Sequence, residues 1–237
     1  MSTKIGITKL RQWDEKWNEI FQHYQQDLRH SYYINAFLNN SDKKVLEMGA
    51  GSFRDMANLN KLGVDCSGTD YSETSVNNAK KYFDNIAHKI FQSDAFYMNN
   101  IQDDEYDVTF HNGLWVLFEN DDDILNLAKE QARISKNKMI VTVHNAHNQK
   151  FTEYFEKLAE NDPLYKIRFF SINEIEELML KVCKSISIYP VGKGKKYFED
   201  QMINEGNHSR ESLNSFFRNT KLANLENSER LMCIGNL

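Results

Sequence analysis

Two short stretches of the chain carry residue types that could bind a nucleoside. Residues 45–55 read VLEMGAGSFRD, so an apolar run ends in an acid, Glu47, and a Gly-x-Gly turn follows from Gly49. Residues 68–72 read GTDYS and hold a second acid, Asp70. A glycine turn after one strand and an acid after the next is the layout of a nucleoside site at the carboxyl edge of a parallel sheet, where the acid accepts hydrogen bonds from the ribose.

The glycine turn does not suit a dinucleotide. The pyrophosphate fingerprint has a third small residue three positions after the second glycine, and here that position holds Arg54. Glu47 would repel a pyrophosphate, whereas it would balance a cationic ligand. S-adenosylmethionine (SAM) carries a sulfonium and an ammonium but no phosphate. We therefore expect a SAM site, with an NAD-type oxidoreductase as the alternative from a different class.

Several motifs resemble those of a known family. The (E/D)xGxG block of residues 47–51 resembles the first signature of class I SAM-dependent methyltransferases, and the resemblance extends from about residue 43 to about residue 191. Residues 168–179, RFFSINEIEELM, are similar to the RFFSxxELEELL segment of the type-11/type-25-like small-molecule methyltransferases. Residues 144–148, HNAHN, are similar to the VPNxxN turn of that family, with His in place of Pro.

The resemblance implies a role for each part of the cofactor site. The glycines let the backbone approach the ligand, Glu47 balances the methionine ammonium, Asp70 binds the ribose, and Tyr71 and Asp94 lie at the adenine. Asp70 and Asp94 could instead serve as caps of a loop or turn. The predicted cofactor-binding residues are Glu47, Gly49, Ala50, Gly51, Asp70, Tyr71, Ser72, Asp94, Ala95, Asn112, Gly113 and Trp115.

Methyl transfer is an in-line displacement at a sulfonium carbon, so positioning does most of the work. A base is needed only for an acceptor that is protonated at the working pH. The predicted catalytic residues for a hydroxyl acceptor are His111, His144 and His147, because histidine can be neutral near pH 7. Each could instead be a structural histidine. The spacing of His144 and His147 could hold a metal, but no third ligand follows, so we predict no metal site.

Composition restricts the class of protein. The chain has 237 residues, of which 41% are hydrophobic and 27% charged, as expected for one globular domain with embellishments. A net charge of −5 disfavours bulk nucleic-acid binding. The three cysteines follow no disulfide or zinc spacing. The sequence shows no signal core and no apolar run near the roughly 18 residues of a membrane span. We expect a cytoplasmic protein that makes no membrane contact, and the many Asn, Lys and Ile residues are typical of an AT-rich bacterial genome.

Strand-like and helix-like segments alternate along the chain, which predicts an α/β fold. In the resembling family the sheet is doubly wound, Rossmann-like and mostly parallel, with seven strands, and its last strand is antiparallel between the fifth and sixth. We expect the same arrangement here. The predicted strands cover residues 44–48, 64–69, 90–91, 106–110, 139–143, 185–191 and 231–234.

Two segments lie outside this sheet. Apolar residues at helical spacing between residues 10 and 28 predict an N-terminal helical cap, residues 1–40, that covers the cofactor or packs on the core. Residues 41–191 and 230–237 form the predicted SAM-binding domain. Residues 192–229 form a predicted helical insertion, which leaves the sheet at its ligand-binding edge and could be a substrate lid, a disordered segment or an oligomer contact.

We therefore expect a SAM-dependent methyltransferase that methylates an oxygen or nitrogen of a small molecule or glycan precursor. A protein or RNA methyltransferase of the same fold is one alternative, and a noncatalytic SAM-binding partner subunit is another. The sequence indicates neither the identity of the acceptor nor the oligomeric state.

Overall fold

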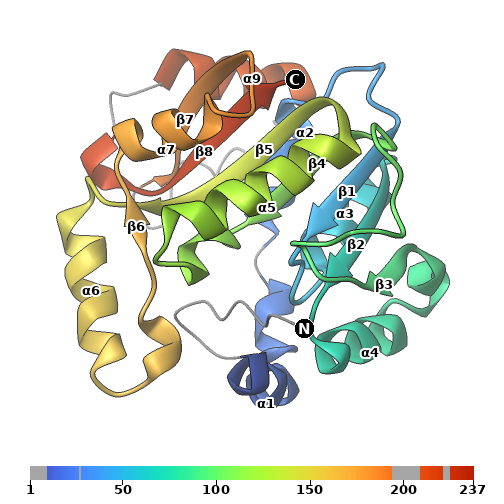
Figure 1. Cartoon of the computed structure of the whole chain (residues 1–237), viewed down its shortest axis with the longest axis horizontal. Coiled ribbons are helices and arrows are strands. Elements are labelled where there is room, and N and C mark those ends of the chain that lie inside the picture. The colour runs from blue at the N-terminus through green and yellow to red at the C-terminus, as the bar shows by residue number, and fades with distance from the viewer. Residues whose placement is uncertain (1–9, 27, 194–208, 221–224) are drawn as a thin grey trace.

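The computed structural model describes residues 10–26, 28–193, 209–220 and 225–237. Its centre is one sheet with the strand order β3-β2-β1-β4-β5-β8-β7, and β6 pairs with β5 beside this path (Figure 1). The strands are β1 (Lys44–Met48), β2 (Asp65–Asp70), β3 (Ile90–Gln92), β4 (Tyr106–Asn112), β5 (Ser135–Asn145), β6 (Phe169–Phe170), β7 (Ser185–Lys193) and β8 (Ser228–Asn236).

The strand directions confirm the predicted fold. Strands β1 to β5 pair in parallel, and β8 pairs antiparallel with both β5 and β7. All seven predicted strands are present, most of them longer than predicted. The prediction missed β6, whose two residues pair with His144 and Asn145 at the end of β5. Two residues are too few to give a period in the sequence.

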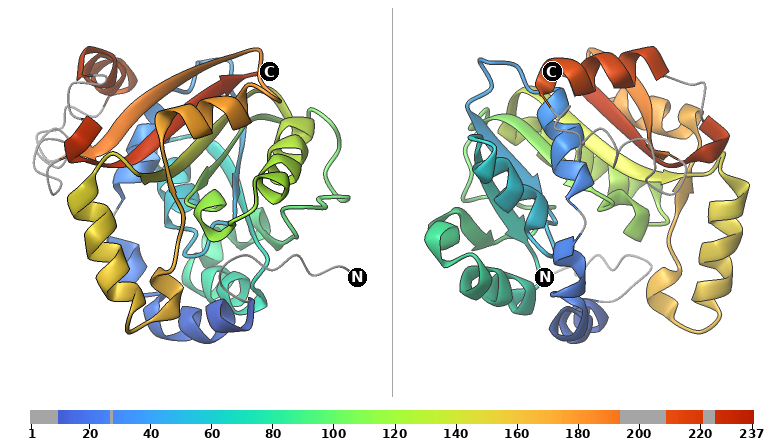
Figure 2. Two further views of the ribbon diagram at one scale, coloured as in Figure 1. Left: turned by 60° about the vertical axis from the view of Figure 1, so that its left-hand side comes forward. Right: turned by 180° about the vertical axis from the view of Figure 1, so that it is seen from behind.

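Helices cover both faces of the sheet. The helices α2, α3 and α9 pack on one face, and α5 and α7 pack on the other (Figures 1 and 2). Side chains of β5 alternate between the two cores, as a strand between two layers must, with Ile140 in one core and Val141 in the other. The α-helices are α1 (Leu10–Ile20), α2 (Arg29–Ala36), α3 (Arg54–Lys61), α4 (Glu73–Tyr82), α5 (Asp121–Ile134), α6 (Gln149–Ala159), α7 (Ile172–Met179) and α9 (Arg210–Thr220).

Side-chain caps stabilise the starts of several helices. Ser72 caps α4 and accepts a hydrogen bond from the Ser75 amide. Ser171 and Glu174 form the predicted capping box at the start of α7, where each side chain binds the backbone of the other. These caps satisfy amides that the first turn of a helix leaves unpaired.

The N-terminal segment is two helices, not the single predicted one. Helix α1 ends at Ile20, a 3-10 turn covers His23–Gln26, and α2 begins at Arg29. The turn is tied to the glycine loop, because Gln25 donates to the Ser52 carbonyl at 3.0 Å and Arg54 donates to the Tyr24 carbonyl at 2.6 Å. Helix α1 packs against α4, whereas α2 packs against α3 and α9.

Helix α9 is the described part of the predicted insertion. Its side chains Leu213 and Phe217 are buried, and the Phe217 ring packs edge-on against Tyr33 of α2 at 5.2 Å. Asn214 donates to the Ala36 carbonyl at 3.0 Å. This helix therefore belongs to the core layer beside α2. The helix predicted near residues 198–203 lies outside the described residues, and a substrate lid stays a prediction.

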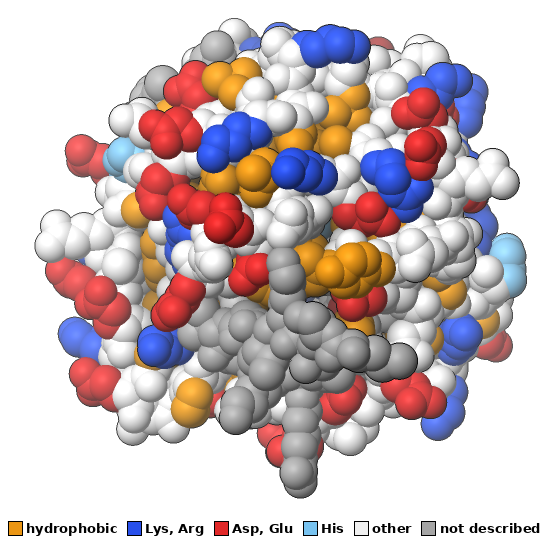
Figure 3. Space-filling model, viewed as in Figure 1, with side chains coloured by type: hydrophobic (Ala, Val, Ile, Leu, Met, Phe, Trp, Pro, Cys, Tyr) orange, Lys and Arg blue, Asp and Glu red, His pale blue; other side chains and the backbone are white. Residues whose placement is uncertain are grey.

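Acidic and basic side chains are interspersed on the face seen in Figure 3. Within the described part of the chain, no helix combines the length and apolarity needed to cross a membrane. Cys66, Cys183 and Cys233 are buried and free.

Candidate active site

The glycine turn after β1 is shaped by side chains from other elements. Gly49 and Gly51 have φ values of 59° and 54°, in the left-handed region that favours glycine. A Cβ on Gly49 would lie 3.0 Å from Leu114 Cδ1, and one on Gly51 would lie 2.4 Å from Trp17 Cζ2. The close approach at Gly51 is therefore made by α1. A further approach by a cofactor stays a prediction.

Two carboxylates are buried beside this turn. Glu47 is 2% exposed, and its Oε2 accepts a hydrogen bond from the Met56 amide of α3 at 2.9 Å. Burial raises the pKa of Glu47 well above its ordinary value, and the charge of nearby Asp55, also buried, adds to the shift. A bound cation would favour the ionised form of both carboxyls. The site therefore fits a ligand with an ammonium and a sulfonium, and it disfavours a pyrophosphate.

Asp70 joins the turn to the next helix. Its Oδ2 accepts from the Gly51 amide and its Oδ1 from the Ser72 amide, both at 2.8 Å. Burial raises the pKa of this carboxyl to about 6. Ionised carboxylate oxygens accept more than one bond each, so room for ribose hydroxyls remains. The Ser72 hydroxyl donates to Asp14 of α1, which ties the cap to this edge. Ala50 is buried within the turn.

A cleft of about 450 Å³ opens beyond β2 and β3. Three of its lining residues are acidic and none is basic, which suits an uncharged adenosine and again disfavours a phosphate. Tyr71, predicted to pack on the adenine, is 41% exposed there. The lining residues are Asp14, Tyr71, Glu73, Gln92, Ser93 and Asp94.

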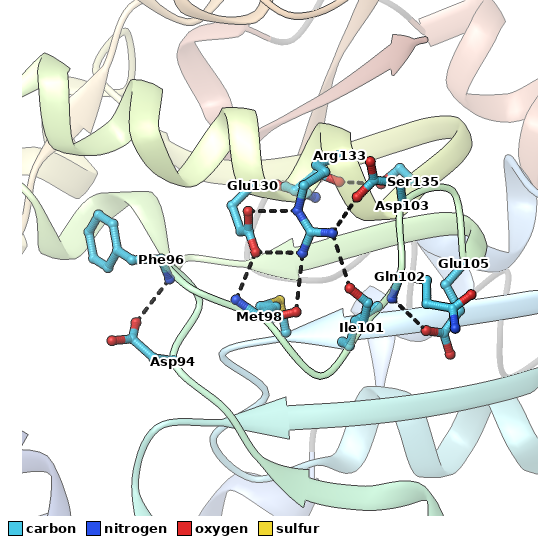
Figure 4. A network of polar contacts seen from close by, with 11 residues as sticks. Asp94, Phe96, Met98, Ile101, Gln102, Asp103, Glu105, Glu130, Arg133 and Ser135 are labelled. Carbon is cyan, nitrogen blue, oxygen red and sulfur yellow. Dashed lines mark hydrogen bonds and ion pairs between the residues drawn. The ribbon is translucent and has the colours of Figure 1, made fainter.

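The loop after β3 is held by α5. Asp94 accepts a hydrogen bond from the Phe96 amide at 2.9 Å, which is the turn geometry left open above. Arg133 of α5 donates to the carbonyls of Ile101 and Met98 at 3.0 and 3.1 Å and pairs with acids on both sides (Figure 4). This clamp fixes the cleft wall that carries Asp94 and half-buried Ala95. Their adenine contacts stay predictions.

The end of β4 places one predicted base in the core. His111 is 0% exposed, and burial lowers its pKa to about 3. Its Nδ1 accepts from the Leu114 amide at 3.3 Å, so its proton lies on Nε2 and the basic nitrogen is engaged. Trp115 is also 0% exposed, and its ring packs 5.5 Å from that of His111. Both are therefore core side chains, and the roles predicted for them stay predictions.

Asn112 and Gly113, at the end of β4, connect this loop to neighbouring elements. The Asn112 amide donates to Asp55 Oδ2 at 3.4 Å, which brings the β4 loop beside the start of α3. Gly113 has a φ of 88°, and its amide donates to the Thr142 carbonyl at 2.8 Å. The loops after β1 and β4 thus meet, as the cofactor prediction requires.

The two histidines after β5 have different surroundings. His147 is exposed, and its Nε2 accepts from the Ile172 amide at 3.2 Å, so it caps α7. His144 is 5% exposed, and neither ring nitrogen has a hydrogen-bond partner among the described residues. Burial lowers the pKa of His144 well below its usual value, and the charges of Arg230 and His30 add to this. Of the three predicted bases, His144 fits best.

Sequence reasoning missed Arg230 at this edge. Arg230 lies near the start of β8, with its Nη1 3.3 Å from where a Cβ of Gly113 would be. Arg29 and His30 begin α2 and are 7% and 8% exposed. Nothing local marks Arg230, because strand register alone brings it beside His144. Among the described residues, no group of three His, Cys, Asp or Glu side chains could hold a metal.

Comparisons with known proteins agree with this geometry. Residues 39–213 match the family model described as a methyltransferase domain. No curated protein matches the chain. A SAM-dependent methyltransferase from Archaeoglobus fulgidus is 14% identical with a TM-score of 0.63, over 96% of this chain and 99% of its own. The plantazolicin methyltransferase BamL is 15% identical with a TM-score of 0.64, over 96% and 93%.

A third similar structure is the geranyl diphosphate C-methyltransferase from Streptomyces coelicolor A3(2), which is 10% identical with a TM-score of 0.56, over 94% of this chain and 83% of its own. At such identities these structures support the fold alone, whereas the family model covers most of the chain. The predictions of the fold and of the family cofactor, SAM, are confirmed. The chain belongs to the methyltransferase domain family, as a class I SAM-dependent methyltransferase.

Proposed function

We propose that this enzyme transfers a methyl group from SAM to an oxygen or nitrogen of a small-molecule acceptor, such as a glycan precursor. A lone pair of the acceptor forms the new bond to the methyl carbon while the carbon–sulfur bond breaks, and S-adenosylhomocysteine (SAH) leaves. The reaction needs the acceptor atom held in line with that bond. The role of the chain is to hold both partners and to receive a proton where the acceptor carries one.

The cofactor half of the site is built by β1, β2 and β3. Asp70 binds the ribose hydroxyls, and the acid-lined cleft takes the adenine beside Tyr71 and Asp94. Glu47 and Asp55, both 2% exposed, supply negative charge near the glycine turn for the methionine ammonium. Gly49, at the end of β1, lies in van der Waals reach of Leu114 from the β4 loop, so the two halves of the site adjoin there.

The observation that carries the choice of a small acceptor is the burial of His144. Its ring is 5% exposed and lies 5.1 to 5.5 Å from the rings of Phe151, Phe155 and Phe169. An acceptor that meets this histidine must pass the side chains that bury it, which suits a small molecule better than a protein or RNA. A neutral His144 would receive the proton of a hydroxyl acceptor.

The first experiment measures binding of SAH and NAD by calorimetry. Wild type and Asp65→Asn, a control at the other end of β2, should bind SAH with micromolar affinity and should not bind NAD. Asp70→Asn should bind SAH at least tenfold more weakly, because hydrogen bonds to a charged group contribute about 1.5–3 kcal/mol. Binding of NAD without binding of SAH would favour the oxidoreductase alternative and contradict the proposal.

A second measurement separates the acceptor classes. Purified enzyme is incubated with methyl-labelled SAM and with separated small-molecule, protein and RNA fractions of a cell extract. Label should enter the small-molecule fraction. Label in protein or RNA would support the macromolecular alternative, and SAH binding without any labelled product would support a noncatalytic partner subunit.

A further inference from the structure

Arg230 reaches across the acceptor half of the site. Its backbone pairs with His144 of β5 on one side and with Val191 of β7 on the other. Its Nη1 nevertheless lies 3.3 Å from the position of a Cβ on Gly113, at the end of β4. Because β5 separates β4 from β8, the side chain must cross the end of β5 to reach Gly113. The guanidinium therefore lies where the loops after β4 and β5 meet.

The Arg230 side chain makes no ion pair or hydrogen bond with the described residues, although the charge of Glu229 lies near enough to act on it. Glu229 itself pairs with Arg29 at 4.0 Å. Burial lowers the pKa of Arg230 to about 10; the charge of Glu229 opposes this shift, and the charges of Arg54 and Arg29 add to it. At this pKa the group stays protonated at pH 7. A sheltered guanidinium without a hydrogen-bond partner is unfavourable unless an anion joins it.

The neighbours of Arg230 indicate the rest of the ligand. His144, directly across the β5–β8 pair, is surrounded by three phenylalanine rings. The planar fork of a guanidinium matches a carboxylate or phosphate with two parallel hydrogen bonds. A guanidinium next to these aromatic rings therefore matches an anionic group attached to a flat apolar body.

On the basis of the proposed function, we propose that Arg230 binds an anionic group of the acceptor, a carboxylate or a phosphate. The methionine carboxylate of SAM is the competing source of negative charge. The backbone of Arg230 belongs to β8, whereas the glycine turn, Asp70 and the adenine cleft belong to β1, β2 and β3. Its guanidinium reaches Gly113 at the end of β4, beside β1, so titrations with cofactor analogues are needed to distinguish the two sources. Arg54, at the start of α3 directly after the turn, is the arginine on the cofactor side.

The test uses matched probes on the SAH-saturated enzyme. Benzoate and phenyl phosphate carry the anion on a flat ring, and benzamide is the neutral counterpart of benzoate. Calorimetry should give at least tenfold tighter binding of benzoate or phenyl phosphate than of benzamide to wild type and to Arg218→Gln, an exposed control on α9. In Arg230→Gln this preference should fall at least tenfold. Arg230→Lys should keep part of it, because the charge remains but the fork is lost.

Separate titrations with SAH and with 5′-methylthioadenosine, which lacks the amino-acid carboxylate, identify the source of the anion. We expect both affinities to be unchanged in Arg230→Gln. A loss of SAH affinity alone would assign Arg230 to the cofactor carboxylate and overturn the proposal. Equal binding of benzoate, phenyl phosphate and benzamide to wild type would overturn it without any variant. Failure of wild type to bind SAH would instead remove the proposed function.

Discussion

The ionisation of Asp70 has opposite effects on folding stability and on ribose binding. Its carboxylate accepts hydrogen bonds from Gly51 and Ser72, yet burial raises its pKa from an ordinary 3.8 to about 6. The folded protein therefore retains this proton at pH values where the unfolded chain has released it. The stability that this group contributes is fully present below about pH 4 and is lost as the pH rises through about 6. Ribose binding has the opposite requirement, because the ionised form is the better acceptor.

We predict that SAH binding weakens as the pH falls through 6. If only the ionised Asp70 binds the ribose, the dissociation constant at pH 5 should be about tenfold higher than at pH 7, since one pH unit below the pKa leaves about a tenth of the groups ionised. Calorimetry at pH 5, 6 and 7 measures this on wild type and on the exposed Asp65→Asn control. Asp70→Asn should bind weakly at every pH. The same pH dependence in Asp70→Asn would assign the titration to another group.

At the scale of elements, α1 closes over the glycine turn through contacts at both of its sides. Trp17 lies against Gly51, Asp14 accepts from Ser72, and Lys16 lies 3.7 Å from Asp162 in the turn after α6. The helix therefore spans from the cofactor side to the α6 side of the sheet edge, as Figure 1 also shows. This arrangement supports the predicted cover.

A methyl group at Gly51 should disturb this contact. Gly51→Ala combines a left-handed backbone with a Cβ 2.4 Å from Trp17, so we expect it to lower the free energy of unfolding by about 1–3 kcal/mol beyond the cost of the backbone alone. Gly63→Ala gives that backbone cost, because Gly63 has a φ of 84° and open space around it. Urea unfolding measures both variants.

Introducing Gly51→Ala into a Trp17→Ala background tests whether contact with the Trp17 ring causes the extra destabilisation. There the extra cost of Gly51→Ala should fall, since the ring that the new Cβ meets is gone. Equal costs for Gly51→Ala and Gly63→Ala in the wild-type background would show that α1 does not constrain the turn.

Sequence patterns predicted the elements whose signals are local. The strand that ends at Met48, the glycine turn and the capping box at Ser171 each depend on neighbours within a few residues. The break after Ile20 depends on hydrogen bonds to the glycine loop far along the chain, so helical spacing alone could not reveal it. The position of Arg230 depends on the register of three strands, which no local pattern encodes.

Burial distinguishes the three predicted histidines, and the sequence does not encode burial at strand ends. His111, His144 and His147 all follow predicted strands at the ligand edge. The structure buries His111 in the core, engages His147 at the start of α7, and leaves His144 among aromatic rings. The residue type predicted the three candidate histidines, and tertiary packing gives each of them different surroundings.

At the scale of the whole molecule, an ion pair fixes the N-terminal region to the sheet far from the site. Lys138 of β5 pairs with Asp42, before β1, at 2.9 Å, and their side chains are 8% and 0% exposed. Lys138 also donates to the Phe37 carbonyl at 2.9 Å. The contact lies at the edge where β1 and β5 begin. Helix α2 is therefore held at its end by this pair, while its first residues face the ligand edge.

Replacing Lys138 should reveal the free-energy cost of burying the charged carboxylate of Asp42. Lys138→Met leaves the carboxylate of Asp42 buried without its cation, so we expect the free energy of unfolding to fall by about 3–5 kcal/mol. Lys44→Met is the matched control, because Lys44 pairs with Glu105 at 2.8 Å but is 44% exposed, and surface pairs contribute only about 0–1 kcal/mol. Urea unfolding gives both values, and Asp42→Asn in the Lys138→Met background should recover part of the lost stability by removing the charge.

The affinity for SAH, measured without urea under conditions in which Lys138→Met is folded, should stay unchanged because the pair lies at the opposite edge of the sheet. A cost for Lys138→Met no larger than that for Lys44→Met would mean that the pair does not hold the N-terminal region in place.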